Sequence, residues 1–95
     1  MAVVVRLTVS PASQEQFNVL DERVGQAMDA AGGPPDGLMA HVVHADGEGF
    51  VLVDVWRSEA DGRAYVDGPL RELMTEVGLS PGETQVLPVW SFARP

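Results

Sequence analysis

The sequence contains no cysteine and no lysine, and it has no long run of apolar residues. Without cysteine, neither disulfides nor thiolate–metal bonds can stabilise the chain. The apolar start of the chain ends at Arg6, too early for a membrane span. It also lacks the basic start and small-residue cleavage site of a signal peptide. We therefore expect a cytoplasmic protein that does not associate with a membrane.

Positive charge is also scarce. Six arginines are the only basic side chains besides two histidines, and the formal net charge is −8. A nucleic-acid partner requires a basic face, and an anionic membrane surface attracts clusters of Lys and Arg. The composition therefore argues against both kinds of partner. The acidic residues are scattered along the chain, a pattern typical of a solvated surface.

The chain has 95 residues, which is enough for one domain, so we expect a single domain over 1–95. A domain of this size buries a modest fraction of its surface, and its stability is correspondingly low. Self-association is the remaining way to bury more apolar area.

Apolar periodicity predicts strands at 3–9, 38–44, 50–56 and 85–92, with a helical region after the first strand and another after the third. Ser13 and Gln16 form a capping-box pattern, and Gly68-Pro69 interrupts the second helical region. The order β-α-β-β-α-β is the ferredoxin-like α+β arrangement, with an antiparallel sheet ordered 4-1-3-2. Pro88 agrees with the edge position of the fourth strand, where a missing N–H is tolerated.

The strands are apolar on both faces. A sheet covered by helices on one side alternates apolar and polar residues, but 3–5, 42–43 and 50–53 are continuously apolar. Two helices cover only one face of a sheet. The second face therefore predicts a homodimer that packs sheet on sheet.

The element order and the stretch Asp54-Val55-Trp56-Arg57-Ser58-Glu59-Ala60 resemble the dimeric α+β barrel superfamily, which includes antibiotic biosynthesis monooxygenase domains. The chain is most similar to actinobacterial members without an assigned function. The resemblance implies a homodimer of secondary metabolism and a ligand cavity between sheet and helices, with Trp56 in its wall and no bound cofactor. Many members have a histidine nine residues after the tryptophan; this chain has Tyr65, which argues against haem degradation.

Asp54 and Trp56 share one face of the third strand. A buried carboxylate requires a partner, and Arg6 is the only strongly charged residue of the neighbouring first strand. We therefore expect an Arg6–Asp54 ion pair, structural or functional. If Asp54 instead faces a dry cavity alone, its raised pKa suits a general acid or base.

Two further side chains could take part in proton transfer. His41 and His44 are three residues apart on a strand, so they face opposite sides and predict no metal site. His41 is the better candidate for a cavity-facing acid or base, because His44 adjoins the turn. Tyr65 could donate its hydroxyl to a substrate carbonyl, or it could lie in water on the helix flank.

Two functions remain open. The first is a cofactor-independent monooxygenase, or a cyclase or isomerase, that acts on an aromatic or polyketide-like ligand. Asp54, His41 and Tyr65 would be its catalytic residues, and its substrate-binding residues would be Trp56, Arg6, Phe17 and Phe50. The alternative is a non-catalytic dimeric binding or interaction protein. A cavity with convergent polar groups favours the enzyme, and a core filled by side chains favours the alternative.

Overall fold

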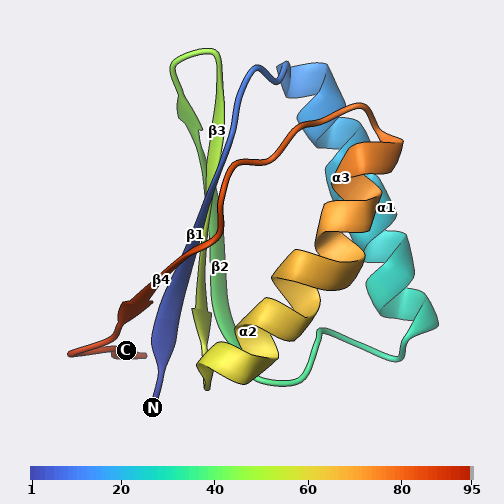
Figure 1. Ribbon diagram of the computed structural model, residues 1–95. Helices are drawn as coiled ribbons and strands as arrows, with labels where there is room; N and C mark the ends of the chain where they lie inside the picture. Colours follow the sequence, from blue (N-terminus) through green and yellow to red (C-terminus); the bar gives the residue numbers. More distant parts are fainter. Residues whose placement is uncertain (95) are drawn as a thin grey trace.

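The computed structural model describes residues 1–94 as an antiparallel four-stranded sheet with two helical regions on one face (Figure 1). Its elements are β1 (Val3–Val9), α1 (Gln14–Ala30), β2 (Leu38–Asp46), β3 (Gly49–Trp56), α2 (Glu59–Tyr65), the kinked segment η1 (Val66–Leu70), α3 (Arg71–Glu76) and β4 (Gln85–Pro88). The sheet order is β2-β3-β1-β4. This confirms the ferredoxin-like α+β fold predicted from the sequence.

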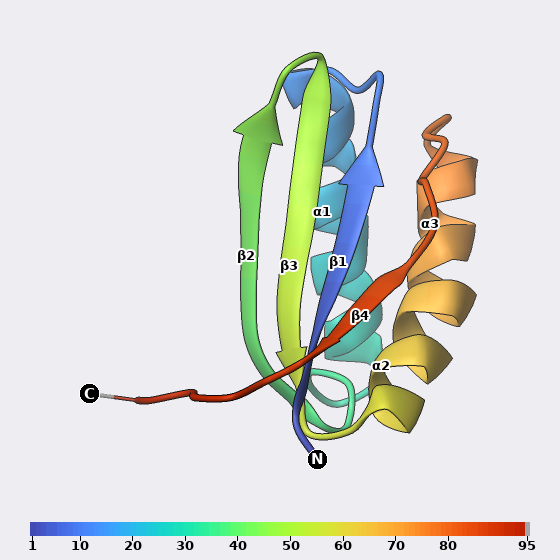
Figure 2. The same ribbon diagram turned by 60° about the vertical axis from the view of Figure 1, so that its left-hand side comes forward.

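The predicted capping box starts α1. The Ser13 hydroxyl accepts the Gln16 backbone N–H at 3.1 Å, and the Gln16 side-chain oxygen accepts the Ser13 N–H at 3.0 Å. These two bonds satisfy donors that the first turn of a helix leaves free. The helix then lies behind the sheet in the view of Figure 2 and presents Leu20 to the core.

The second helical region bends at the predicted interruption. α2, η1 and α3 follow one another without a loop, and Gly68 has non-helical φ and ψ angles of −108° and −105°. Pro69 lacks the N–H that a regular helix would use, so the helix kinks there. Tyr65 is the last residue before η1.

The core lies between the sheet and the helices. Side chains alternate along β1, where Val5, Leu7 and Val9 are fully buried and Arg6 and Thr8 are exposed. On β3, Trp56 is fully buried against α2. A Cβ atom at Gly62 would lie 3.1 Å from the indole ring, so the absence of a side chain at Gly62 allows this close approach.

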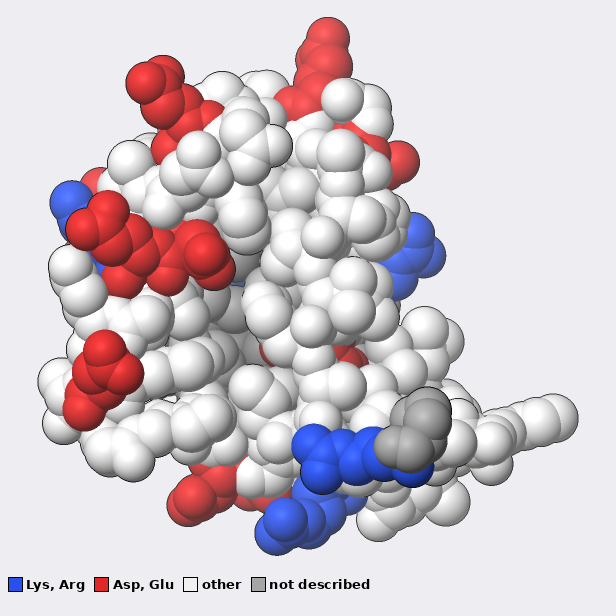
Figure 3. Space-filling model, turned by 180° about the vertical axis from the view of Figure 1, so that it is seen from behind, with Lys and Arg blue, Asp and Glu red and all other residues white. Residues whose placement is uncertain are grey.

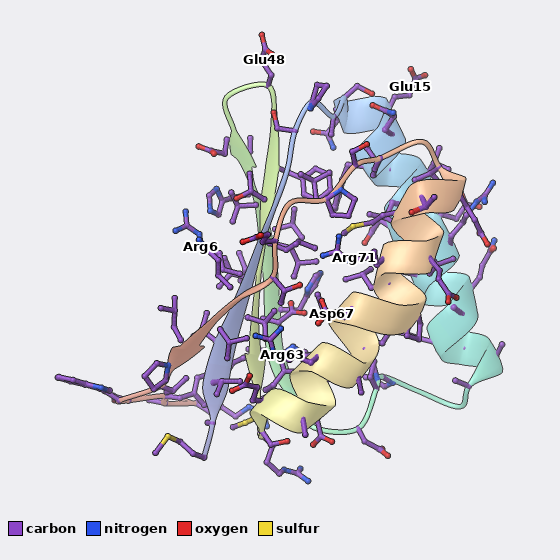
Figure 4. The ribbon with its side chains drawn as sticks, viewed as in Figure 1. Arg6, Glu15, Glu48, Arg63, Asp67 and Arg71 are labelled. Carbon is purple, nitrogen blue, oxygen red and sulfur yellow. The ribbon has the colours of Figure 1, made fainter. Side chains whose placement is uncertain are left out.

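The other face of the sheet has no covering layer among residues 1–94 (Figures 1 and 2). Val42 is 58% exposed and Leu87 49% exposed on this face. It also carries Arg6, which points away from the helices (Figure 4).

β4 is shorter than the predicted strand at 85–92. It ends at Pro88, and one further bond, from Val89 N–H to the Ala2 carbonyl at 3.1 Å, follows it. The chain then leaves on the uncovered side of the sheet (Figure 2), with Trp90 97% exposed. Apolar alternation alone cannot show this departure, because it depends on how far a neighbouring strand extends.

Candidate functional site

A cavity of about 360 Å³ lies between α1 and the sheet, and the surface is hollowed on this side (Figure 3). This volume falls at the lower end of the range of small-molecule sites, about 300–1,000 Å³. Most of its wall is apolar. It is lined by Phe17, Leu20, Asp21, Val24, Gly25, Met28, Pro34, Leu38, His41, Val43, Phe50, Leu52, Asp54, Tyr65 and Leu70.

His41 and Asp54 form a hydrogen-bonded pair in the sheet wall of the cavity. They are directly opposite each other in the β2–β3 register, and His41 Nδ1 lies 2.6 Å from Asp54 Oδ1. The Asp54 side chain is 3% exposed and the His41 side chain 47% exposed. The carboxylate therefore lies beneath the imidazole, and the imidazole separates it from solvent.

A bulge in β2 contributes to this geometry. The register shifts between Leu38, opposite Trp56, and Ala40, opposite Val55. Residues three apart on a regular strand face opposite sides, but the extra residue lets Leu38 and His41 both face the cavity.

The hydrogen bond to Asp54 raises the pKa of His41 above its ordinary value of 6.5. Burial opposes this effect, and the negative charges of Asp54 and Asp21 add to it. An imidazole with a raised pKa is a stronger base, and its bonded carboxylate stabilises the imidazolium that forms when it takes a proton.

The raised pKa predicts a pH-dependent stability. The folded protein binds the His41 proton more tightly than the unfolded chain, so this stabilisation is complete below about pH 6.5 and disappears as pH rises through the folded pKa. The free energy of unfolding of the parent, relative to His41→Gln, should be larger at pH 6 than at pH 9. We expect a difference on the order of 1 kcal/mol or less, because solvent screens the half-exposed ring. Urea denaturation of both proteins at pH 6 and pH 9 measures these free energies of unfolding. If the parent and His41→Gln differ by the same amount at both pH values, the raised pKa of His41 would be contradicted.

Tyr65 contributes to the opposite wall of the same cavity. Burial, and secondly the Asp54 charge, raise the pKa of Tyr65 above its ordinary value of 10.0. The phenol therefore keeps its proton at neutral pH and can donate a hydrogen bond. Its ring centroid lies 5.8 Å from that of Trp56, which packs behind it.

Two sequence-based predictions are wrong. Arg6 is opposite Val53 in the register and faces the uncovered side of the sheet, so it can neither pair with Asp54 nor reach the cavity. Successive residues of a strand point to opposite faces of the sheet, so Arg6 faces away from the cavity. In β1, Val5 is the residue opposite Asp54. Trp56 is completely buried under α2 and does not line the cavity, because Gly62 lets the helix cover the indole.

The other predicted residues meet at the cavity. His41, Asp54 and Tyr65 line it, and so do Phe17 and Phe50, whose rings form an edge-to-face pair with centroids 5.2 Å apart. His44 lies on the opposite face of β2, as predicted.

Sequence reasoning missed Asp21 and Gly25 of α1, which also line the cavity. A signal for both was present, because they follow Phe17 at four-residue intervals and therefore lie on the same side of the helix. The absence of a side chain at Gly25 leaves space there, since a Cβ atom would meet nothing within 4 Å.

The arginines of the second helical region stabilise the fold and lie outside the cavity. Arg63, Asp67 and Arg71 follow one another along this region (Figure 4). Asp67 lies between the two guanidinium groups, and Arg71 donates to the Gly82 carbonyl at 3.0 Å and to Thr84 Oγ1 at 3.3 Å. These bonds hold the segment before β4 against the helix.

Within residues 1–94, no group of three or more His, Asp or Glu side chains is arranged to hold a metal ion. None of the helices in the same range is long and apolar enough to cross a membrane.

Solved structures with the same fold include oxygenases. One is a point mutant of SnoaB, a cofactor-independent oxygenase from Streptomyces nogalater. It matches with a TM-score of 0.63 and 11% sequence identity, and the match covers 96% of this chain and 94% of SnoaB. An antibiotic biosynthesis monooxygenase-like protein from Deinococcus radiodurans matches with a TM-score of 0.60 at 13% identity over 100% and 98%. A point mutant of MhuD, with two manganese protoporphyrin IX molecules per active site, matches with a TM-score of 0.57 at 16% identity over 98% and 99%.

No family model and no curated protein sequence matches the chain. The structural matches establish that the chain has the fold of antibiotic biosynthesis monooxygenase-like proteins.

Proposed function

We propose that the protein is a cofactor-independent monooxygenase that acts on an aromatic or polyketide-like substrate with an acidic C–H group. The observation that carries the proposal is the His41–Asp54 pair in the wall of an apolar cavity. A base oriented by a buried carboxylate and facing a space of ligand size is the arrangement that proton abstraction requires.

His41 is the proposed general base. Its Nδ1 is occupied by Asp54, so Nδ1–H donates to the carboxylate and Nε2 is the nitrogen that accepts the substrate proton. Asp54 stabilises the resulting imidazolium and fixes the tautomer.

Tyr65 is the proposed hydrogen-bond donor to the substrate oxygen. Removing a proton next to a carbonyl places negative charge on that oxygen as the enolate forms. A phenol that remains protonated can stabilise this charge from the wall opposite His41. The edge-to-face pair of Phe17 and Phe50 would contact the planar rings.

Molecular oxygen completes the proposed reaction. The substrate carbanion transfers its electrons to O₂ and forms a C–O bond, and the resulting peroxide takes a proton. Loss of the second hydrogen from the same carbon then breaks the O–O bond. The CH₂ group becomes a ketone and one water molecule leaves, so the substrate is the only reductant. Without oxygen, the same proton abstraction could serve ring closure or isomerisation.

We also propose that the active protein is a homodimer that packs through the uncovered sheet face. Apolar Val42 and Leu87 are exposed on this face, and the C-terminal segment with Trp90 leaves on the same side. An isologous pair would cover both, as the resemblance to dimeric α+β barrels implies.

Tyr65→Phe tests the catalytic proposal. With a tricyclic anthrone as substrate, the parent should consume one O₂ per ketone formed, and Tyr65→Phe should lower the rate about 10- to 100-fold. Its melting temperature should remain close to that of the parent, because the ring and its packing against Trp56 are retained. An oxygen electrode and product mass spectrometry provide the measurement. Ligand binding by the parent without any turnover would favour the non-catalytic binding protein.

A further inference from the structure

The charged groups that line the cavity are predominantly acidic. Asp21 and Asp54 contribute two carboxylates, and His41 and Tyr65 are the only other titratable groups in the wall. None of the six arginines in the described chain lines it. Even with a protonated His41, the wall keeps a net negative charge.

Asp21 lies at the mouth of the cavity. It lines the cavity from α1 and is also exposed to solvent, whereas Asp54 is buried in the sheet wall. Its charge acts on His41 from the helix side. A ligand that contacts His41 therefore lies near both carboxylates.

We propose that Asp21 and Asp54 select against anionic ligands, so that the substrate enters the cavity as an uncharged molecule. A carboxylate or phosphate on the part of the ligand inside the cavity is excluded. This inference rests on the proposed function of the same cavity and specifies its substrate class.

The physical reason is desolvation without compensation. An anion that enters an apolar cavity loses its hydration, and this loss is offset only by a cation or by several donors. Here it would meet two carboxylates and no guanidinium group. A phenol remains neutral, makes hydrogen bonds with His41 or Tyr65, and avoids this cost. The net charge of −8 adds a repulsion at longer range.

A matched pair of ligands tests the proposal. The two probes are 1,8-dihydroxyanthraquinones that differ at one ring position, which carries a hydroxymethyl group in one and a carboxylate in the other. Binding is measured at pH 8 by tryptophan quenching in a Trp90→Phe background, and by thermal shift. We expect the parent to bind the hydroxymethyl compound at least about 10-fold more tightly, as expected for like charges a few ångströms apart in a partly solvated site.

Asp21→Asn should reduce this preference several-fold, because the shape of the side chain is kept and its charge is lost. Asp29→Asn is the matched control, since Asp29 is also an exposed aspartate on α1 but does not line the cavity. It should leave the preference unchanged. Added salt should also reduce the preference of the parent.

Equal affinity of the parent for both compounds would overturn the inference and leave the proposed function intact, since the cavity would still bind the aromatic ring system. Equal effects of Asp21→Asn and Asp29→Asn would show that Asp21 does not determine the preference. Failure of both compounds to bind would count against the cavity as a ligand site, and so against the proposed function as well.

Discussion

Replacing His41 by Gln is expected to lower the rate of substrate oxidation by about 100- to 10,000-fold, the range for loss of a positioned general base. Gln keeps hydrogen-bonding capacity toward Asp54 but cannot take a proton from carbon. The measurement is oxygen uptake with saturating anthrone. The parent rate should rise with pH through the His41 pKa, which the Asp54 bond holds above 6.5, because only the neutral imidazole accepts a proton.

His44→Gln provides the control for this prediction. His44 belongs to the same strand but faces the opposite side of the sheet, so its replacement should change the rate less than twofold. A comparable loss in both variants would indicate damage to β2 and not loss of a base. A His41→Gln variant with the parent rate would eliminate His41 as the base.

Asp54→Asn extends the same test to the positioning residue. The amide keeps the size of the side chain but loses the charge that stabilises the imidazolium, so the rate should fall about 100-fold or more. The pKa of His41 should also decrease, since the bond to the Asp54 carboxylate is the largest cause of its increase. The ascending limb of the pH–rate profile should therefore move to lower pH. A purely structural role for Asp54 would lower the rate without moving this limb.

Replacing Val42 by Asp is expected to dissociate the proposed homodimer. Val42 is 58% exposed on the uncovered sheet face, and an isologous interface would bury the new charge twice. A buried unpaired carboxylate costs several kcal/mol, so the dimer should weaken at least about 100-fold. Sedimentation at micromolar concentration should show a dimer for the parent and a monomer for the variant. In a structure of the parent dimer, the total interface should exceed about 1,000 Å².

Val19→Asp is the matched control for the assembly. Val19 is also an exposed valine, 42% accessible. It lies on α1, which covers the face of the sheet opposite to the proposed interface. Its replacement should leave the dimer intact. If Val42→Asp fails to fold, Leu87→Asp places a charge on the same face in the edge strand. A parent that sediments as a stable monomer would refute the assembly.

Much of the fold could be predicted from local patterns. The spacing of Phe17, Leu20, Val24 and Met28 defines α1, Ser13 and Gln16 start it, and Gly68-Pro69 interrupts the second helical region. These features act within a few residues of one another. The parity of β3 likewise placed Asp54 and Trp56 on one face, and the spacing of His41 and His44 placed them on opposite faces.

The partner of Asp54 depended on the tertiary structure. The sequence offered Arg6 as the neighbouring charge, but strand register puts Val5 opposite Asp54 on one side and His41 on the other. A shift of one residue reverses the face of every side chain, and β-strand patterning does not determine which residues are opposite each other. The β2 bulge, which sets the positions of Leu38 and His41, is equally invisible in the sequence.

By itself, the sequence determined the element order, the shared face of Asp54 and Trp56, and the presence of apolar residues on both faces of the strands. Only the tertiary structure decided which of these side chains meet. It covered Trp56 with α2 because Gly62 permits the close approach, and it brought Asp21 of α1 to the mouth of the cavity beside His41. Periodicity is a local property of each segment, whereas a site is formed by the packing of distant segments, and that packing depends on the shapes of all of them.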